Sequence, residues 1–196
     1  MYSEEELISG CVKGKRSAQK ALYDLYASRM FGICLRYARN RDDAEDMLQE
    51  GFIKIYSSMS SFRGQGSFEG WMKRIMVNNA LNMLRKNAKA FLFSELNEST
   101  YVVPDETENE NDLMKLYGEI PPQILMKQIA ALPDGYKVVF NLYAIEDYSH
   151  KEIGEMLNIS ENTSKSQLSR ARKYLRKRLE ELISVENPKP LINEQR

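Results

Sequence analysis

The stretch YSHKEIGEMLNISENTSKSQLSRARKYLRKRL, from Tyr148 to Leu179, decides the fold of the C-terminal half of this chain. Ser149 and Glu152 form a capping-box pattern, in which the serine side chain and the glutamate side chain each satisfy an amide of the first turn. This pattern predicts a helix that begins at about His150. One apolar stripe marks the buried face of that helix: Ile153, Met156 and Leu157.

A second helix follows closely within the same stretch. The first helix should end near Leu157, because Asn158 adopts the left-handed conformation at little cost. Ser160 then caps the second helix. The inward face of this helix has residues spaced by four, three and four: Ser164, Leu168, Ala171 and Leu175. Two helices separated by a turn of about three residues predict a helix-turn-helix.

The outward face of the second helix is polar and basic. It carries Asn162, Lys165, Ser166, Ser169, Arg170 and Lys173. Short polar side chains allow close approach to base edges, and cations bind phosphates or guanine, so the face suits the DNA major groove. The alternative is a solvated helix end whose cations complement the helix dipole. The dipole explains the positions of Arg176–Arg178 at the helix end. Lys165 lies near the helix start, where the dipole is unfavourable to a cation, and an external anion explains this lysine more simply.

The composition of the whole chain limits the classes of protein to consider. The 196 residues include 28 basic and 28 acidic side chains, so the net charge is zero and charged surfaces must be local. Cys11, Cys34 and His150 cannot complete a zinc site, and both cysteines suit buried positions. The sequence shows neither a secretory leader nor a membrane-spanning run. We therefore predict a soluble cytoplasmic protein with no metal or cofactor.

Apolar residues recur at helical spacing in the N-terminal half as well. One predicted stripe consists of Ala18, Leu22, Leu25 and Met30. A second consists of Ala44, Leu48, Phe52, Ile55 and Met59. A third, apolar at first and polar later, consists of Trp71, Ile75, Asn78, Leu81, Asn82 and Arg85. No stretch alternates as strands do, so the predicted fold is all-α.

The segment Val103–Asn111 (VPDETENEN) is acidic and polar, and it cannot bury enough apolar surface to order itself. It is either a surface loop or a flexible linker, and the self-sufficient flanking segments favour the linker. We predict two small helical domains, residues 1–92 and 120–184, joined by an acidic linker, residues 93–119, and followed by a tail, residues 185–196.

Two features of the first domain bear on function. An acidic flank accompanies the stripe that contains Ala44, and it includes Asp42, Asp43, Glu45, Asp46 and Glu50. Such a flank is usually only a solubilising surface. The second feature is a glycine-containing loop, FRGQGSF (Phe62–Phe68), which leads into a basic, amide-rich helix. This loop lacks the nucleotide-binding fingerprint but suits single-stranded DNA. Trp71 is expected to belong to the core.

The motifs taken together resemble those of a bacterial sigma factor of the extracytoplasmic-function (ECF) group. The motifs are DDAEDMLQEGFIKIY (Asp42–Tyr56), FRGQGSFEGWMKRIMVNNALNMLRK (Phe62–Lys86), ALPDGYKVVF (Ala131–Phe140) and the opening stretch. They cover nearly the whole chain outside the linker and the tail. The resemblance implies a factor that binds core RNA polymerase, recognises promoter DNA and helps to melt it.

The resemblance also implies roles for individual residues. Contacts with the polymerase clamp fall on Asp43, Glu45, Asp46, Gln49 and Glu50. Contacts with the minus-ten element, duplex and melted strand, fall on Arg63, Lys73, Arg74, Asn78, Asn79, Arg85 and Lys86. The helix-turn-helix would read the minus-thirty-five element through Asn162, Lys165, Ser166, Ser169, Arg170 and Lys173. The linker would enter the RNA channel of the polymerase. An anti-sigma factor as a further partner rests on the resemblance alone.

The chain departs from the family pattern at four positions. Ser164 replaces a buried valine and should weaken packing, Asn158 replaces a glycine, and Asn82 replaces an aspartate. Gln167 replaces an arginine, which we expect to alter sequence preference.

An alternative function is a free-standing helix-turn-helix repressor or activator, which would need an apolar cavity or a dimer interface in residues 1–90. An enzyme is not expected, because the sequence contains no catalytic constellation.

Overall fold

The computed structural model describes residues 2–87 and 120–186, and all regular elements in these ranges are helical. The chain divides into two compact units, Met1–Lys89 (unit 1) and Ala90–Arg196 (unit 2). The all-α prediction is confirmed. The predicted linker, residues 93–119, lies outside the described residues, as do residues 187–196 of the tail, and the domain boundaries stay predictions.

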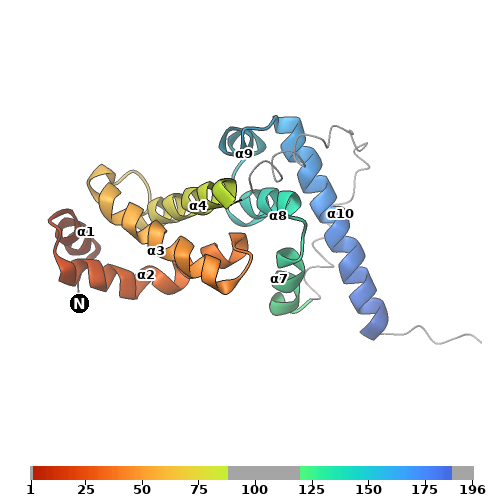
Figure 1. Cartoon of the computed structure of the whole chain (residues 1–196), viewed down its shortest axis with the longest axis horizontal. Helices are drawn as coiled ribbons and strands as arrows, with labels where there is room; N and C mark the ends of the chain where they lie inside the picture. The colour runs from red at the N-terminus through yellow and green to blue at the C-terminus, as the bar shows by residue number, and fades with distance from the viewer. Residues whose placement is uncertain (1, 88–119, 187–196) are drawn as a thin grey trace, which may run out of the picture. The chain divides into compact units, whose positions relative to one another are not determined.

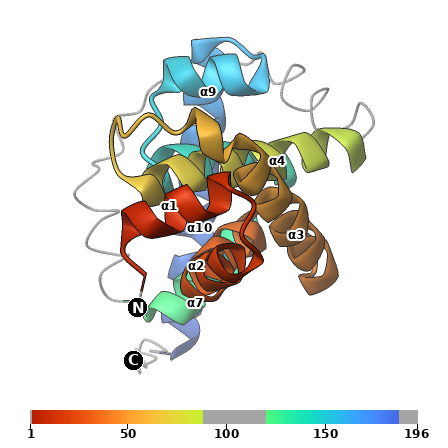
Figure 2. The same cartoon turned by 90° about the vertical axis from the view of Figure 1, so that its left-hand side faces the viewer.

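The described part of unit 1, residues 2–87, contains four α-helices and one short 3-10 turn (Figure 1). They are α1 (Glu4–Val12), α2 (Arg16–Tyr37), α3 (Arg41–Ser58), η1 (Met59–Ser61) and α4 (Phe68–Asn87). The long helices α2, α3 and α4 pack pairwise, and α1 packs against α2 (Figure 2). Side-chain caps mark the beginning of two of these helices: Ser3 and Glu6 form a capping box on α1, and Asn40 caps α3.

The core of unit 1 confirms the second predicted stripe, since all five of its residues, Ala44 to Met59, are buried. The first stripe is wrong at Leu25, which is 58% exposed, whereas the neighbouring Tyr26 is buried. The third stripe is wrong in phase at its apolar start, Trp71 and Ile75, although its Leu81 is buried. The buried face of α4 consists of Phe68, Met72, Met76, Val77, Asn79, Ala80, Leu81 and Leu84. Trp71 and Ile75 are only half-buried at its edge.

Unit 2 contains α7 (Pro122–Ala130), α8 (Asp134–Phe140), a π-helical turn η2 (Asn141–Ile145), α9 (His150–Leu157) and α10 (Glu161–Glu186). The long helix α10 contacts α7, α8 and α9, which lie along one side of it (Figure 1). Each of these described helices contributes residues to the core: Ile129, Leu132, Val138, Val139, Phe140, Leu142, Ile153, Leu157, Leu168, Ala171, Leu175 and Leu179.

Both cysteines are free thiols in buried positions, as predicted. Burial raises the pKa of Cys11, and it raises the pKa of Cys34 to about 12, which keeps both groups protonated and unreactive. In the described ranges, no helix is long and apolar enough to span a bilayer, and no acidic, histidine and cysteine side chains gather into a metal site.

Candidate functional site

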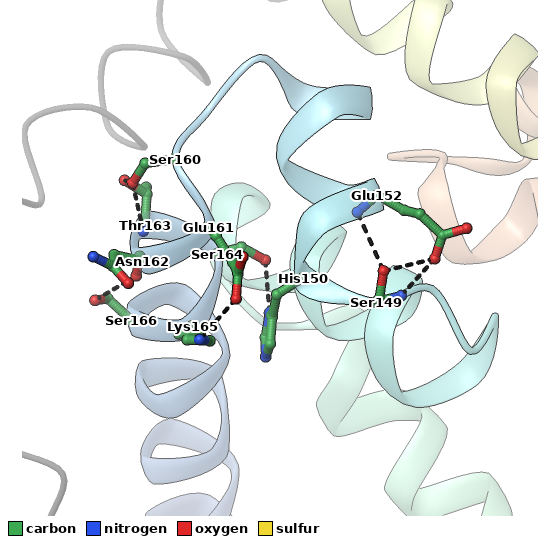
Figure 3. A network of polar contacts seen from close by, with 10 residues as sticks. All are labelled: Ser149, His150, Glu152, Ser160, Glu161, Asn162, Thr163, Ser164, Lys165 and Ser166. Carbon is green, nitrogen blue, oxygen red and sulfur yellow. Dashed lines mark hydrogen bonds and ion pairs between the residues drawn. The ribbon is translucent and has the colours of Figure 1, made fainter.

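The start of the helix-turn-helix has the predicted capping geometry (Figure 3). The amide of Glu152 donates to Ser149 Oγ over 3.3 Å, and the amide of Ser149 donates to Glu152 Oε2 over 2.9 Å. Asn158 is left-handed, with φ 55° and ψ 47°. Ser160 Oγ accepts from the amide of Thr163 over 2.9 Å. The predicted helix bounds at His150 and Leu157 and the predicted cap of the second helix are therefore confirmed.

The turn between α9 and α10 depends on a glycine that the sequence analysis missed. The amide of Ile159 donates to the carbonyl of Gly154 over 3.0 Å. A Cβ on Gly154 would lie 2.9 Å from the carbonyl oxygen of Ile159, closer than real Cβ atoms approach. The two helices can therefore meet this tightly only because residue 154 has no side chain.

The first half of α10 separates into the two predicted faces. The inward residues Ser164, Leu168, Ala171 and Leu175 are all buried. On the outward face, Asn162, Lys165 and Lys173 are exposed, and Ser166, Ser169 and Arg170 are half-buried. Asn162, Ser166, Ser169 and Lys173 follow one another at spacings of four, three and four, so they form one stripe along the helix. The residues proposed to read DNA are thus brought together.

Two residues of α10 differ from the sequence interpretation. Lys165 Nζ lies 2.8 Å from Glu161 Oε1, so an acid of the same helix already compensates its charge, and the external anion is not needed to explain it. The lysine lowers the pKa of Glu161 through this hydrogen bond. Gln167 is 1% exposed, and its Oε1 has no hydrogen-bond partner among the residues that the structure describes. Gln167 is therefore too buried to contact DNA itself, and its effect on sequence preference stays a prediction.

Ser164 is a polar residue in an apolar seam, and the structure supplies its partner. Ser164 Oγ and His150 Nδ1 share a hydrogen bond of 2.9 Å between α10 and α9 (Figure 3). The expected loss of packing at Ser164 is thus offset by a polar contact that the sequence did not reveal. Burial lowers the pKa of His150, and so do the nearby cations Lys165 and Arg172, while Glu161 opposes the shift.

In unit 1, α3 buries its apolar face and leaves the acidic flank outside. Glu45, Asp46 and Gln49 are exposed, whereas Asp43 and Glu50 are half-buried. Glu45 also pairs with Arg41 at 2.9 Å, an exposed contact that contributes little to stability.

The sequence interpretation missed one residue of this surface, Ile53. It is 66% exposed and follows Asp46 and Gln49 at spacings of seven and four, so it lies on their side of α3. The signal was available, because Ile53 falls outside the apolar stripe that contains Phe52. An exposed isoleucine beside carboxylates gives this helix face an apolar point of contact.

The outer face of α4 carries most residues predicted to bind the minus-ten element. Lys73, Arg74, Asn78, Arg85 and Lys86 are exposed. Asn82 is exposed as well, and its Oδ1 accepts from Arg85 Nη1 over 2.9 Å.

Asn79 contradicts the prediction. It is 1% exposed, its Nδ2 donates to the carbonyl of Met47 over 2.9 Å, and its Oδ1 accepts from Lys54. Asn79 therefore connects α4 to α3 and is not available to DNA.

The loop before α4 needs glycine at two positions, because Gly64 and Gly66 have φ values of 70° and 91°. Arg63 is exposed in this loop. Ser67 Oγ accepts from the amide of Gly70 over 3.0 Å and begins the helix.

Aromatic rings fix both ends of the loop. Trp71 stacks on Phe68 with centroids 5.7 Å apart, and Phe62 contacts both rings at 5.2 and 5.4 Å. Trp71 is thus a half-buried packing residue.

Two family models match the chain in the order of its two units. Sigma-70 region 2 matches residues 22–90, and sigma-70 region 4 matches residues 123–175. The ECF RNA polymerase sigma factor SigW of Bacillus subtilis is 33% identical over 177 residues, which are 87% of this chain and 93% of SigW. The chain belongs to the ECF sigma factor family. The ECF sigma-E factor of Haemophilus influenzae is 29% identical and covers 92% of the chain and 97% of its own length.

ECF sigma factors direct RNA polymerase to promoters, and this chain is such a transcription initiation factor. The membership decides against the free-standing repressor. A solved structure, the sigma factor RpoE with the anti-sigma factor NepR from Bartonella quintana, has the same fold. It is 20% identical, has a TM-score of 0.51, and covers 82% of this chain and 96% of its own.

Proposed function

We propose that the two units divide promoter recognition between them. Residues 1–92 bind core RNA polymerase and the minus-ten element, residues 120–184 read the minus-thirty-five element, and residues 93–119 link them. The matches of region 2 to residues 22–90 and of region 4 to residues 123–175 support this division.

The observation that carries the proposal is the outer face of α3. Its opposite face is buried in the core of unit 1, yet Asp46 and Gln49 stay exposed beside the exposed Ile53. An apolar anchor within a polar, charged rim is the usual composition of a protein interface. This face, with Asp43, Glu45 and Glu50 at its side, binds the polymerase. The carboxylates provide specificity and steer association, and Ile53 is desolvated in the complex.

The minus-ten element binds the outer face of α4 and the preceding loop. Arg74, Asn78, Asn82 and Arg85 form a stripe with spacings of four, four and three. The amides hydrogen-bond to bases of the melted strand, and the arginines bind phosphates together with Arg63, Lys73 and Lys86. Asn79 is excluded by its burial. Capturing an unstacked base offsets part of the cost of melting, so no chemical energy source is required.

The minus-thirty-five element binds the outer stripe of α10. Asn162, Ser166 and Ser169 are short enough to reach base edges, and Lys165, Arg170 and Lys173 bind phosphates or guanine. Lys165 must then exchange its ion pair with Glu161 for a DNA phosphate.

The proposal extends to the setting in which the chain works. It acts in the cytoplasm as a binding factor and not as an enzyme, and an anti-sigma factor is a further partner. The last point is supported by the solved relative, which was captured with such a factor.

Substitutions on α3 test the proposal. Asp46→Lys and Ile53→Ser should each weaken binding to core polymerase at least about tenfold and reduce transcription in parallel, since both residues are exposed and the fold should survive. Asp24→Lys is the matched control, because it reverses an exposed charge on α2, where Asp24 pairs with Lys20. Unchanged polymerase affinity in both α3 variants would contradict the proposed docking face.

A further inference from the structure

A small polar and aromatic cluster joins the two helices of the helix-turn-helix to the preceding turn η2. His150 lies in the first turn of α9, and its Nδ1 is 2.9 Å from Ser164 Oγ on α10 (Figure 3). The ring of His150 stacks on Tyr143 of η2, with centroids 4.4 Å apart and planes 19° from parallel. Arg172 of α10 lies over the same tyrosine ring, 5.9 Å from its centroid. The four side chains thus link α9, η2 and α10 to one another.

Within this cluster, the hydrogen bond between His150 and Ser164 is the contact that depends most on direction. Ser164 has no exposed surface, and a buried hydroxyl without a partner is costly, so α10 is most stable where Ser164 meets His150. The other inward residues of the helix, Leu168, Ala171 and Leu175, make apolar contacts, which have no preferred direction. Hydrogen bonds weaken steeply as their angle departs from linear. Rotation of α10 about its axis would therefore stretch or bend this hydrogen bond at Ser164.

Ser164 is also in the right place to affect DNA reading. It lies in the same turn of α10 as Asn162, Lys165 and Ser166, which face outward. Each residue advances 100° around a helix, so the direction of Ser164 fixes the directions of these neighbours. Contacts with base edges require correct geometry, and a small rotation would weaken them.

We propose that the hydrogen bond between His150 and Ser164 sets the rotation of α10, so that both are positioning residues for recognition of the minus-thirty-five element. The inference rests on the proposed function of unit 2. Neither side chain needs to touch DNA. The tyrosine contributes by holding the histidine ring in place.

The test uses holoenzyme that contains the full chain and a promoter that the wild-type chain selects from a random library. The measured quantity is the ratio of transcription from the intact promoter to transcription from promoters with single base changes in the minus-thirty-five element. Ser164→Ala removes the hydroxyl, and His150→Phe keeps an aromatic ring against Tyr143 without the hydrogen bond. Each should lower the ratio by about threefold to tenfold, the size expected for one hydrogen bond.

The double variant and two controls separate positioning from folding. The double variant should lose no more discrimination than either single variant, because both remove the same bond. The corresponding ratio for the minus-ten element should not change. Ser57→Ala is the matched control, since its hydroxyl donates only to the carbonyl of Lys54 in its own helix at 3.0 Å.

Different outcomes would contradict the positioning role and the proposed function of unit 2. Discrimination that survives both substitutions, falls additively in the double variant, or falls equally at both promoter elements would overturn the positioning role. A wild-type holoenzyme that ignores the minus-thirty-five element would instead overturn the proposed function of unit 2.

Discussion

The side-chain amide of Asn79 donates a hydrogen bond to the backbone carbonyl of Met47 over 2.9 Å and so connects α4 to α3 inside unit 1. The adjacent Asn78 points outward and is exposed. Two consecutive asparagines therefore face opposite ways: Asn79 connects two helices, and Asn78 is the one that we propose to meet DNA.

Asn79→Ala should destabilise unit 1 by about 1–3 kcal/mol, because it leaves the carbonyl of Met47 and the amine of Lys54 without their partner. Asn78→Ala should change stability by less than about 0.5 kcal/mol but reduce transcription. Urea unfolding followed by the fluorescence of Trp71, the one tryptophan of the chain, measures both effects in unit 1. Equal stability of the two variants would show that Asn79 has no structural role.

Gly154→Ala should destabilise unit 2 by about 1–3 kcal/mol, although alanine normally favours a helix. The added Cβ would lie 2.9 Å from the backbone oxygen of Ile159, which cannot move without opening the turn. Gly32→Ala in α2 is the control, because its Cβ would meet nothing within 4 Å, and it should stabilise by about 0.5–1 kcal/mol. Circular dichroism in urea measures both. A stabilising Gly154→Ala would contradict the close approach.

The stability of unit 2 should fall as the pH drops below about 6.5. His150 has a folded-state pKa below its usual value because of burial and of the cations Lys165 and Arg172, with Glu161 in opposition. The unfolded chain therefore binds the proton first, and the loss levels off once the pH passes the folded-state pKa. The thermal midpoint measured from about pH 8 to about pH 5 tests this. Since His150 is the one histidine of the chain, His150→Phe should lack this component, and an identical profile would refute it.

The chain alone should bind promoter duplex only weakly, with a Kd above about 1 µM at physiological salt. The net charge is zero, and two cations proposed to bind DNA are already paired: Lys165 with Glu161 at 2.8 Å and Lys73 with Glu69 at 3.2 Å. Fluorescence anisotropy with a labelled promoter measures the affinity. Nanomolar binding without polymerase would favour a free-standing regulator.

The helix-turn-helix was predictable because local rules determine it. The capping box of Ser149, the left-handed Asn158 and the cap at Ser160 each depend on neighbours within four residues. The predicted inward face of α10 was correct because its buried residues recur at helical spacing.

What could not be predicted depends on packing between helices. Two pairs of residues in α4 suit a core: Trp71 with Ile75, and Met72 with Met76. Only the packing of the neighbouring helices decides that the methionines are the buried pair. The family resemblance assigned Asn79 to the DNA surface, and the packing of α4 on α3 shows instead that it is buried.

Buried polar residues were the second source of error. Gln167 is buried on α10, although its chemistry alone suggests exposure. Ser164 was correctly expected on the inward face, but its hydrogen-bond partner was not. For Ser164, the partner is His150 on another helix, fourteen residues away, and nothing in the local sequence indicates this bond. Long-range polar contacts of this kind are visible only in the folded structure.

The most direct test of the central claim is in vitro transcription by purified core polymerase over a promoter library, with start sites mapped in the presence and absence of the chain. The account predicts starts that appear only when the chain is added, at promoters that share two sequence elements at a fixed spacing. Start sites unchanged by the chain would contradict it.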